Sequence, residues 1–122
     1  MTTQSSWQLT PEQLAIQAKA AELATDFMAP RAAEVDAAEQ YPWDNVHALR
    51  DAGFTGMTVP AEYGGPGHSF LDAVLVVEQM AKVCGVTGRI AVEANMGAIS
   101  ASTGDSAMRQ TTENIPPKNE AT

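Results

Sequence analysis

Two opposite charges stand four residues apart in the last apolar stretch of the sequence. Arg89 and Glu93 belong to "RIAVEANMG", and residues four apart lie on the same face of an α-helix. Taken alone, this spacing indicates an exposed ion pair, which stabilises a helix by about 0.3 kcal/mol. A role in chemistry requires a further group that meets this face, so the elements around it must be identified first.

The other residues that often carry chemistry are isolated. His47 and His68 have no cluster of Asp, Glu or His at metal-ligand spacing around them, and we expect both on the surface. Cys84 is the only cysteine, so an internal disulfide is excluded. It lies near a predicted helix C-terminus, where the helix dipole does not favour a thiolate. The sequence therefore predicts no catalytic residue and no metal site.

The first predicted helix has a clear beginning. Thr10 is a suitable N-cap, Pro11 occupies the first helical position, and Gln13 completes a capping box. Pro30 has no backbone N–H and clashes with the preceding turn, so it is expected to end or kink this helix near Met28.

Three further stretches show helical spacing. Trp43 to Ala52 is followed by Gly53, which is well placed after a C-cap. Ser69 caps a third helix that Gly85 closes, and a fourth helix is expected over 88–101. Apolar residues make up 44% of the chain and aromatic residues only 6%, which favours close-packed helices over a sheet. The sequence predicts an all-α bundle of about four helices.

The segment "VPAEYGGPGHS", residues 59–69, connects the second and third helices. Pro60 predicts an extended entry, and Gly64, Gly65 and Gly67 are expected to supply bends with positive φ. We interpret the segment as a rigid connection, and direct contact with a substrate is the alternative.

The domain boundaries follow from composition. Residues 1–8 are polar and expected to be frayed, residues 9–101 form the helical domain, and residues 102–122 are expected to be an irregular, disordered tail.

The overall charge excludes some partners. Fifteen acidic residues face seven basic ones, for a net charge of −8, so a phosphate-binding surface for nucleic acid is not expected. No stretch approaches the roughly 20 apolar residues of a membrane span, and no signal peptide is evident at the N-terminus. A cytoplasmic location is expected.

Three segments occur in a recognisable order. They are "MAPRAAEVDAAEQYPWD", "ALRDAGFTGMTVPAEYGGPG" and "SFLDAVLVVEQMAKVCG". Their order and spacing, over about residues 9–100, resemble the N-terminal α-helical domain of the acyl-CoA dehydrogenases.

This resemblance implies a function in fatty acid metabolism. The family's enzymes carry out FAD-dependent α,β-dehydrogenation of acyl-CoA thioesters and pass electrons to an electron-transfer flavoprotein. By position, the helix carrying Arg89, Ile90 and Glu93 would line the acyl-chain pocket, so these three are the candidate substrate-binding residues. The chain contains no segment like the family's flavin-binding segment and no match to its catalytic glutamate. We therefore expect the isolated chain to bind no FAD and to be inactive.

Two interpretations of the chain remain open. One is a truncated or frame-disrupted product, or a diverged remnant, of such an enzyme. Complementing domains could then complete the active site, and the isolated chain could self-associate through the apolar surface that those domains would cover. The other is a small helical protein-interaction module derived from the same domain.

Overall fold

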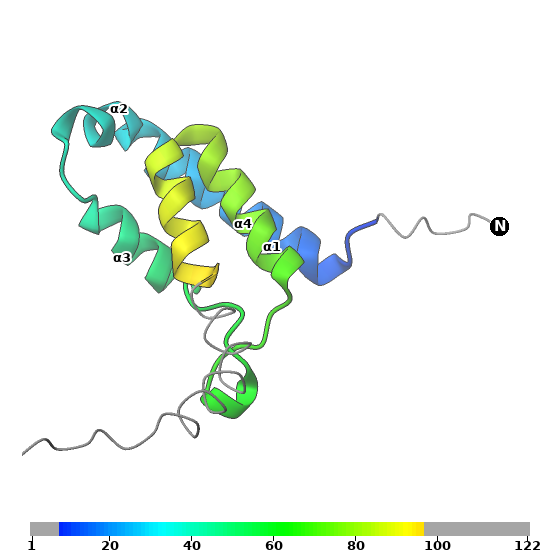
Figure 1. The fold of residues 1–122 in the computed structure, drawn as a ribbon. Helices are drawn as coiled ribbons and strands as arrows, with labels where there is room; N and C mark the ends of the chain where they lie inside the picture. The colour runs from blue at the N-terminus through cyan, green and yellow to red at the C-terminus, as the bar shows by residue number, and fades with distance from the viewer. Residues whose placement is uncertain (1–7, 97–122) are drawn as a thin grey trace, which may run out of the picture.

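The computed structural model describes residues 8–96, and these residues form helices and no strand. Figure 1 shows the elements in chain order. They are α1 (Pro11–Leu23), a π-helical segment (Ala24–Met28), α2 (Ala29–Ala38), α3 (Trp43–Asp51), a 3-10 turn (Ala61–Tyr63) and α4 (Phe70–Val83), followed by a helix that is described from 85 to 96. The predicted all-α class is confirmed.

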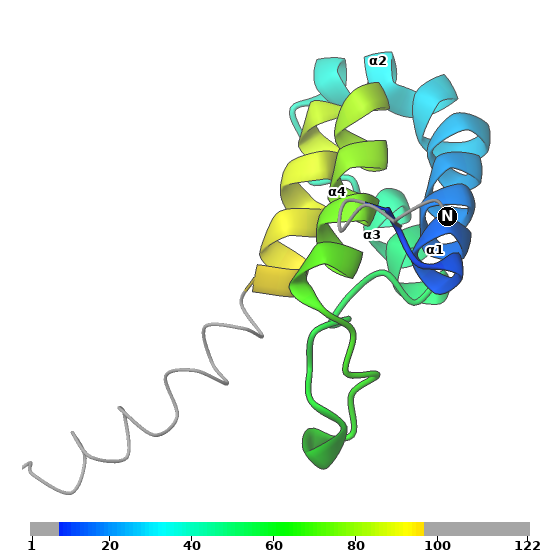
Figure 2. The ribbon, with the colours of Figure 1, turned by 90° about the vertical axis from the view of Figure 1, so that its right-hand side faces the viewer.

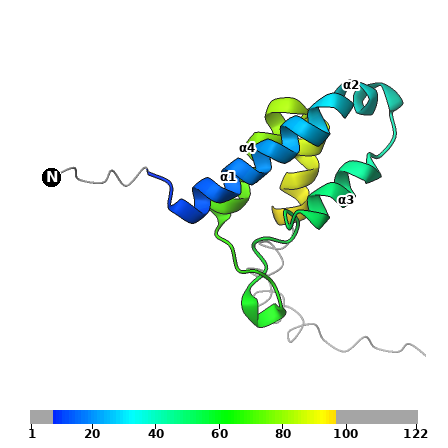
Figure 3. The ribbon, with the colours of Figure 1, turned by 180° about the vertical axis from the view of Figure 1, so that it is seen from behind.

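The first helix begins as its sequence predicts and then continues further. The Thr10 side chain accepts from the Gln13 backbone N–H, while the Gln13 side chain accepts from the Thr10 backbone N–H. Of the two outcomes predicted for Pro30, an end of the helix near Met28 is wrong, because residues 11–38 are helical throughout. The α-helical geometry is instead interrupted by the π-helical segment Ala24–Met28. In the π-helical segment the Ala29 N–H donates to the Ala24 carbonyl, five residues back. Pro30 then falls in the first turn of α2, where a missing N–H costs little. Figure 3 shows α1 and α2 as one continuous run.

The end of α3 confirms the prediction for Gly53. Its φ is +80°, and its N–H donates to the Arg50 carbonyl at 3.0 Å. The next N–H, from Phe54, donates to the Leu49 carbonyl at 2.9 Å. These two bonds form a Schellman motif, which a left-handed glycine makes possible.

The glycine-rich loop projects from one end of the bundle (Figure 2). Pro60 is extended, at φ −60° and ψ 150°, and Gly64 and Gly67 have φ of +80° and +67°, as predicted. The prediction of positive φ at Gly65 is wrong. A Cβ at Gly65 would instead overlap the carbonyl oxygen and side chain of Val59, so this glycine is needed for close approach rather than for its dihedral angles.

The last two helices are separated by one residue. Cys84 is extended, at φ −152° and ψ 106°, and the next helix begins at Gly85 rather than at the predicted Gly88. Gly85 therefore opens a helix instead of closing one. A Cβ at Gly88 would lie 2.8 Å from the Cα and Cβ atoms of Ala81, so the two helices lie in close contact there, side by side in Figures 1 and 2.

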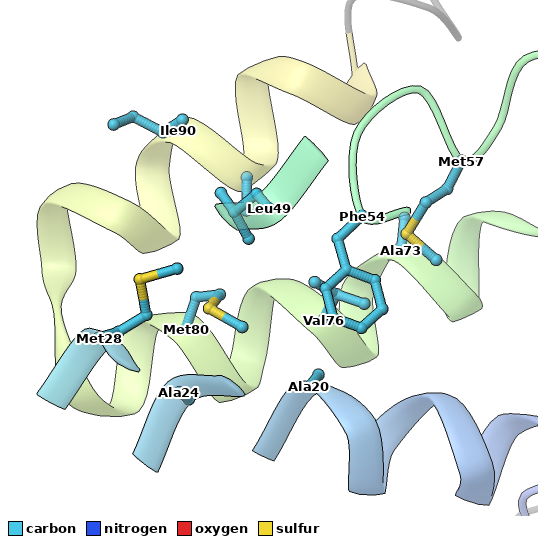
Figure 4. Close-up of a cluster of buried hydrophobic side chains, with 11 residues drawn as sticks. Ala20, Ala24, Met28, Leu49, Phe54, Met57, Ala73, Val76, Met80 and Ile90 are labelled. Atoms are coloured by element: carbon cyan, nitrogen blue, oxygen red, sulfur yellow. The ribbon is translucent and has the colours of Figure 1, made fainter. Parts of the chain in front are cut away.

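The core lies between α1 and α4, with residues from α3, the following turn and the 85–96 helix completing it (Figure 4). Small residues on α1 and α4 let these helices approach each other, and methionines fill the space that remains. The buried cluster is Ala20, Ala24, Met28, Leu49, Phe54, Met57, Ala73, Val76, Met80, Ile90 and Ala91.

Candidate functional site

The 85–96 helix carries the candidate residues, and it divides them between two faces. The Nε atom of Arg89 donates to the Oε1 atom of Glu93 at 3.0 Å. The two side chains are 82% and 59% exposed, so the predicted ion pair is present on the surface. Ile90 is only 6% exposed and belongs to the buried cluster. The structure therefore brings Arg89 and Glu93 together on the surface and buries Ile90 in the core.

The exposed face includes a residue that sequence reasoning missed. Val86 is 39% exposed, and it lies three residues before Arg89 and seven before Glu93, which puts all three on one side of the helix. This side combines one cation, one anion and an apolar side chain. The spacing could have revealed Val86, but the helix was expected to begin only at 88.

The beginning of this helix is held by a buried chain of polar groups, which we call the start anchor. Asn45 of α3 donates from Nδ2 to the Thr87 hydroxyl at 2.9 Å, and that hydroxyl donates to the Cys84 sulfur at 3.2 Å. Asn45 and Thr87 are fully buried. The Oδ1 atom of Asn45 accepts from Arg31 Nε at 3.1 Å. The start anchor thus links α2 and α3 to the first turn of the helix.

The other end of the described helix is held by Asn95, and we call its contacts the end anchor. The fully buried Asn95 side chain accepts from the Met57 N–H at 3.0 Å. It donates to the Phe54 carbonyl at 3.0 Å and to the Ala91 carbonyl at 2.8 Å. The amide oxygen of Asn95 therefore accepts one hydrogen bond, and its nitrogen donates two. The end anchor joins the helix to the turn that follows α3.

Sequence reasoning missed both anchors. Among residues 8–96 no buried side-chain nitrogen or oxygen lacks a partner, so these polar groups are part of the fold and not defects in it. The available signal was positional: Thr87 and Asn95 fall on the inward side of a helix whose inward residues are otherwise apolar or small. Their partners in α3 and the turn could not be read from the sequence.

A second polar cluster joins the starts of α1 and α4. Asp72 accepts from Gln13 Nε2 at 3.1 Å and from the Ser69 N–H at 3.2 Å, and His68 Nδ1 lies 3.2 Å from it. Burial by itself raises the pKa of Asp72, but these hydrogen bonds together bring the pKa below its ordinary value. His68, expected on the surface, is 38% exposed and contacts Asp72, while His47 is exposed.

Two surface depressions lie away from the Arg89 face. One, of about 220 Å³, lies at the turn between α2 and α3 and is lined by Arg31, Tyr41 and Trp43 among others. The other, of about 290 Å³, lies between α1 and the end of α3 beside Lys19 and Ala52. Within residues 8–96, no helix has the length and apolar character to cross a bilayer.

Comparison with known proteins identifies a family. The family model described as "Acyl-CoA dehydrogenase, N-terminal domain" matches residues 10–112. A 3-sulfinopropanoyl-CoA desulfinase of Variovorax paradoxus is 61% identical over 95 residues, which are 78% of this chain and 24% of that protein. The corresponding desulfinase of Advenella mimigardefordensis is 55% identical over 97 residues, covering 80% of this chain and 24% of that protein.

A relative with lower sequence identity is named for a different activity. The short-chain specific acyl-CoA dehydrogenase of Clostridium acetobutylicum is 39% identical over 82 residues, which are 67% of this chain and 22% of that protein. The chain thus spans about a quarter of the length of the curated relatives that it matches.

Proposed function

The chain belongs to the acyl-CoA dehydrogenase family, as its N-terminal helical domain, and from this premise we propose that it provides the acyl-facing helix of an enzyme for 3-sulfinopropanoyl-CoA. The observation that carries this proposal is the 61% identity to a protein named for that substrate. The identity to the short-chain dehydrogenase is lower, at 39%.

The exposed face of the 85–96 helix fits the charge of such a substrate. A sulfinate group is an anion, and the substrate carries it at the far end of a short acyl chain. A strongly acidic chain repels an anion unless a cation stands at the contact point. Arg89 supplies that cation, and a guanidinium can bind two oxygens of one anionic group at once.

Glu93 and Ile90 have supporting roles in this proposal. The exposed Arg89–Glu93 pair contributes about 0.3 kcal/mol, so a substrate anion can take over the guanidinium at little cost. When no substrate is bound, the hydrogen bond to Glu93 holds the Arg89 guanidinium over the exposed face of the helix. Ile90 packs into the core beneath this face and keeps the helix in place.

The cofactor belongs to the family, which is FAD-dependent, and a bound flavin would supply the redox chemistry of the family's dehydrogenation reaction. The two depressions described above, of about 220 and 290 Å³, are open and lie below the roughly 300–1,000 Å³ of typical ligand sites. Neither of them fits a flavin dinucleotide, so we assign no step to the flavin. We expect catalysis only when further domains complete the site.

The remaining partners follow the family. Acyl-CoA is the substrate class, and an electron-transfer flavoprotein is the electron acceptor that the family's dehydrogenation reaction would use. The cytoplasmic location and self-association stay predictions of the sequence.

A second candidate is a small helical interaction module. The observation in its favour is a group of exposed apolar side chains at the linked starts of α1 and α4, namely Leu14, Phe70 and Leu71. A free chain that is monomeric, melts sharply and reversibly, and binds one partner protein through these residues would favour this candidate.

A chimeric enzyme tests the proposed substrate. Residues 8–96 of this chain replace the matching segment of the Variovorax paradoxus relative, and turnover of 3-sulfinopropanoyl-CoA is measured. Arg89→Gln is expected to raise KM by about tenfold or more, because it removes a charge-assisted hydrogen bond. Inhibition by butanoyl-CoA, which has no anionic end, should change little.

Glu93→Gln is the matched control, since it removes the partner but keeps the guanidinium. Its KM for 3-sulfinopropanoyl-CoA should stay the same or fall. An unchanged KM in Arg89→Gln would refute the assignment of Arg89 to the substrate anion.

A further inference from the structure

We propose that the start and end anchors hold the 85–96 helix in one rotational setting, and that Thr87 and Asn95 thereby position Arg89 toward the anionic end of the substrate. This inference rests on the proposed function and adds the residues that orient its cation. Neither Thr87 nor Asn95 is exposed to solvent, so both act through Arg89 and not by touching the substrate.

Apolar packing at Gly88, Ile90 and Ala91 contributes to this setting, but it is less directional than the hydrogen bonds of the two anchors. Next to Ile90, the buried face of the helix presents the small residues Gly88 and Ala91. Burial of apolar surface is non-directional, and small side chains leave few ridges to lock a helix against rotation. Hydrogen bonds, in contrast, weaken steeply when their distance or angle departs from the optimum.

The two anchors lie on either side of Arg89 along the chain. Thr87 precedes it by two residues and is tied to α3 through Asn45. Asn95 follows it by six residues and is tied to the turn at Phe54 and Met57. The Ala94 carbonyl also accepts from the Gly56 N–H at 3.2 Å, and the Asn95 carbonyl accepts from the Thr58 hydroxyl at 3.0 Å. A helix held at two points by groups from other segments can neither slide nor turn freely.

Small rotations matter at the surface of a helix. The side chains extend to a radius of about 5–6 Å, so a rotation of about 10° moves an outer atom by about 1 Å. Displacements of this size can reduce catalysis by about a hundredfold when they misplace a group at the reacting substrate. Loss of either anchor is therefore expected to weaken binding of the anionic substrate more than binding of a neutral acyl-CoA.

The test compares an anionic with a neutral ligand in the chimeric enzyme described above. Thr87→Val keeps the shape of the side chain and removes its hydroxyl, whereas Thr87→Ser keeps the hydroxyl. In Thr87→Val the KM for 3-sulfinopropanoyl-CoA should rise about tenfold relative to the inhibition constant of butanoyl-CoA, and Thr87→Ser should restore the ratio to within about twofold. If Thr87→Val does not fold, Thr87→Ala removes the same hydroxyl with less crowding and is read in the same way.

Val76→Ala is the control for general destabilisation, because it weakens the core and leaves both anchors intact. It should change both constants equally. A Thr87→Val variant that behaves like Val76→Ala, while Arg89→Gln changes the ratio, would overturn this inference and leave the proposed function standing. If Arg89→Gln leaves the ratio unchanged, the proposed function fails and this inference fails with it.

Discussion

At the scale of single residues, Asp72 connects two helix beginnings that are 59 residues apart in the chain. It completes the capping box of α4 with Ser69, and it accepts a hydrogen bond from Gln13, which completes the capping box of α1. One carboxylate thus serves the ends of two helices, and its negative charge lies at the N-terminus of α4, where the helix dipole favours it.

The charge of Asp72 should make stability depend on pH. Its pKa in the folded chain is below the ordinary value of 3.8, so the contribution is fully present above about pH 4 and is lost as the pH falls through the folded pKa. In Asp72→Asn this contribution is absent. Chemical denaturation between pH 6 and pH 3 should therefore show a smaller loss of unfolding free energy in the variant than in the original chain.

Asp51→Asn is a suitable comparison, because Asp51 forms only an exposed pair with Arg50. Exposed pairs contribute little, so its pH dependence should match that of the original chain. An Asp72→Asn variant with the full acid sensitivity would show that the loss of stability arises elsewhere.

At the scale of elements, two glycines at the start of the 85–96 helix have different reasons to be there. A Cβ at Gly88 meets the backbone and side chain of Ala81 at 2.8 Å. A Cβ at Gly85 meets nothing within 4 Å. Gly88 is therefore required by the contact between two helices, whereas Gly85 is not required by any neighbour.

Alanine substitutions separate these cases. Gly88→Ala should lower the unfolding free energy by about 1–3 kcal/mol, because α4 and the next helix must move apart. Gly85→Ala should be neutral or stabilising by up to about 1 kcal/mol, since alanine favours the helix and limits the unfolded chain. Urea unfolding of both variants measures the difference. Equal effects at the two positions would mean that the close contact at Ala81 does not limit stability.

At the scale of the whole molecule, the side of the 85–96 helix that carries Arg89 and Glu93 is an open surface. Arg89 and Glu93 are exposed, and they do not line either of the two depressions described above. Positioning and acid–base catalysis need groups within reach of the reacting atoms of a bound substrate. In the function proposed above, another domain supplies those groups.

This arrangement predicts the flavin content of the purified chain. The full chain should carry no flavin absorbance after purification, and none after incubation with excess FAD followed by gel filtration. The Variovorax paradoxus relative, treated in parallel, serves as the comparison. Stoichiometric flavin in the isolated chain would show that it forms a flavin site by itself and would contradict this account.

The local features of the fold could be predicted from the sequence because their causes are local. The capping boxes at Thr10 and Ser69 and the Schellman motif at Gly53 depend on residues within one or two turns. The pairing of Arg89 with Glu93 has the same origin, since a helix brings residues four apart together. The sequence did not reveal the π-helical segment, which leaves Pro30 in the first turn of α2. The helix therefore continues, although Pro30 was predicted to end or kink it near Met28.

Only the tertiary structure decided which segments the 85–96 helix packs against and bonds to. Thr87 meets Asn45 across 42 positions, and Asn95 meets Met57 across 38. No pattern in the sequence specifies these pairs, because they depend on which segments pack together and at what angle. The sequence by itself indicated the family and most of the helices, and the packing between distant segments decided which side of one helix remains exposed.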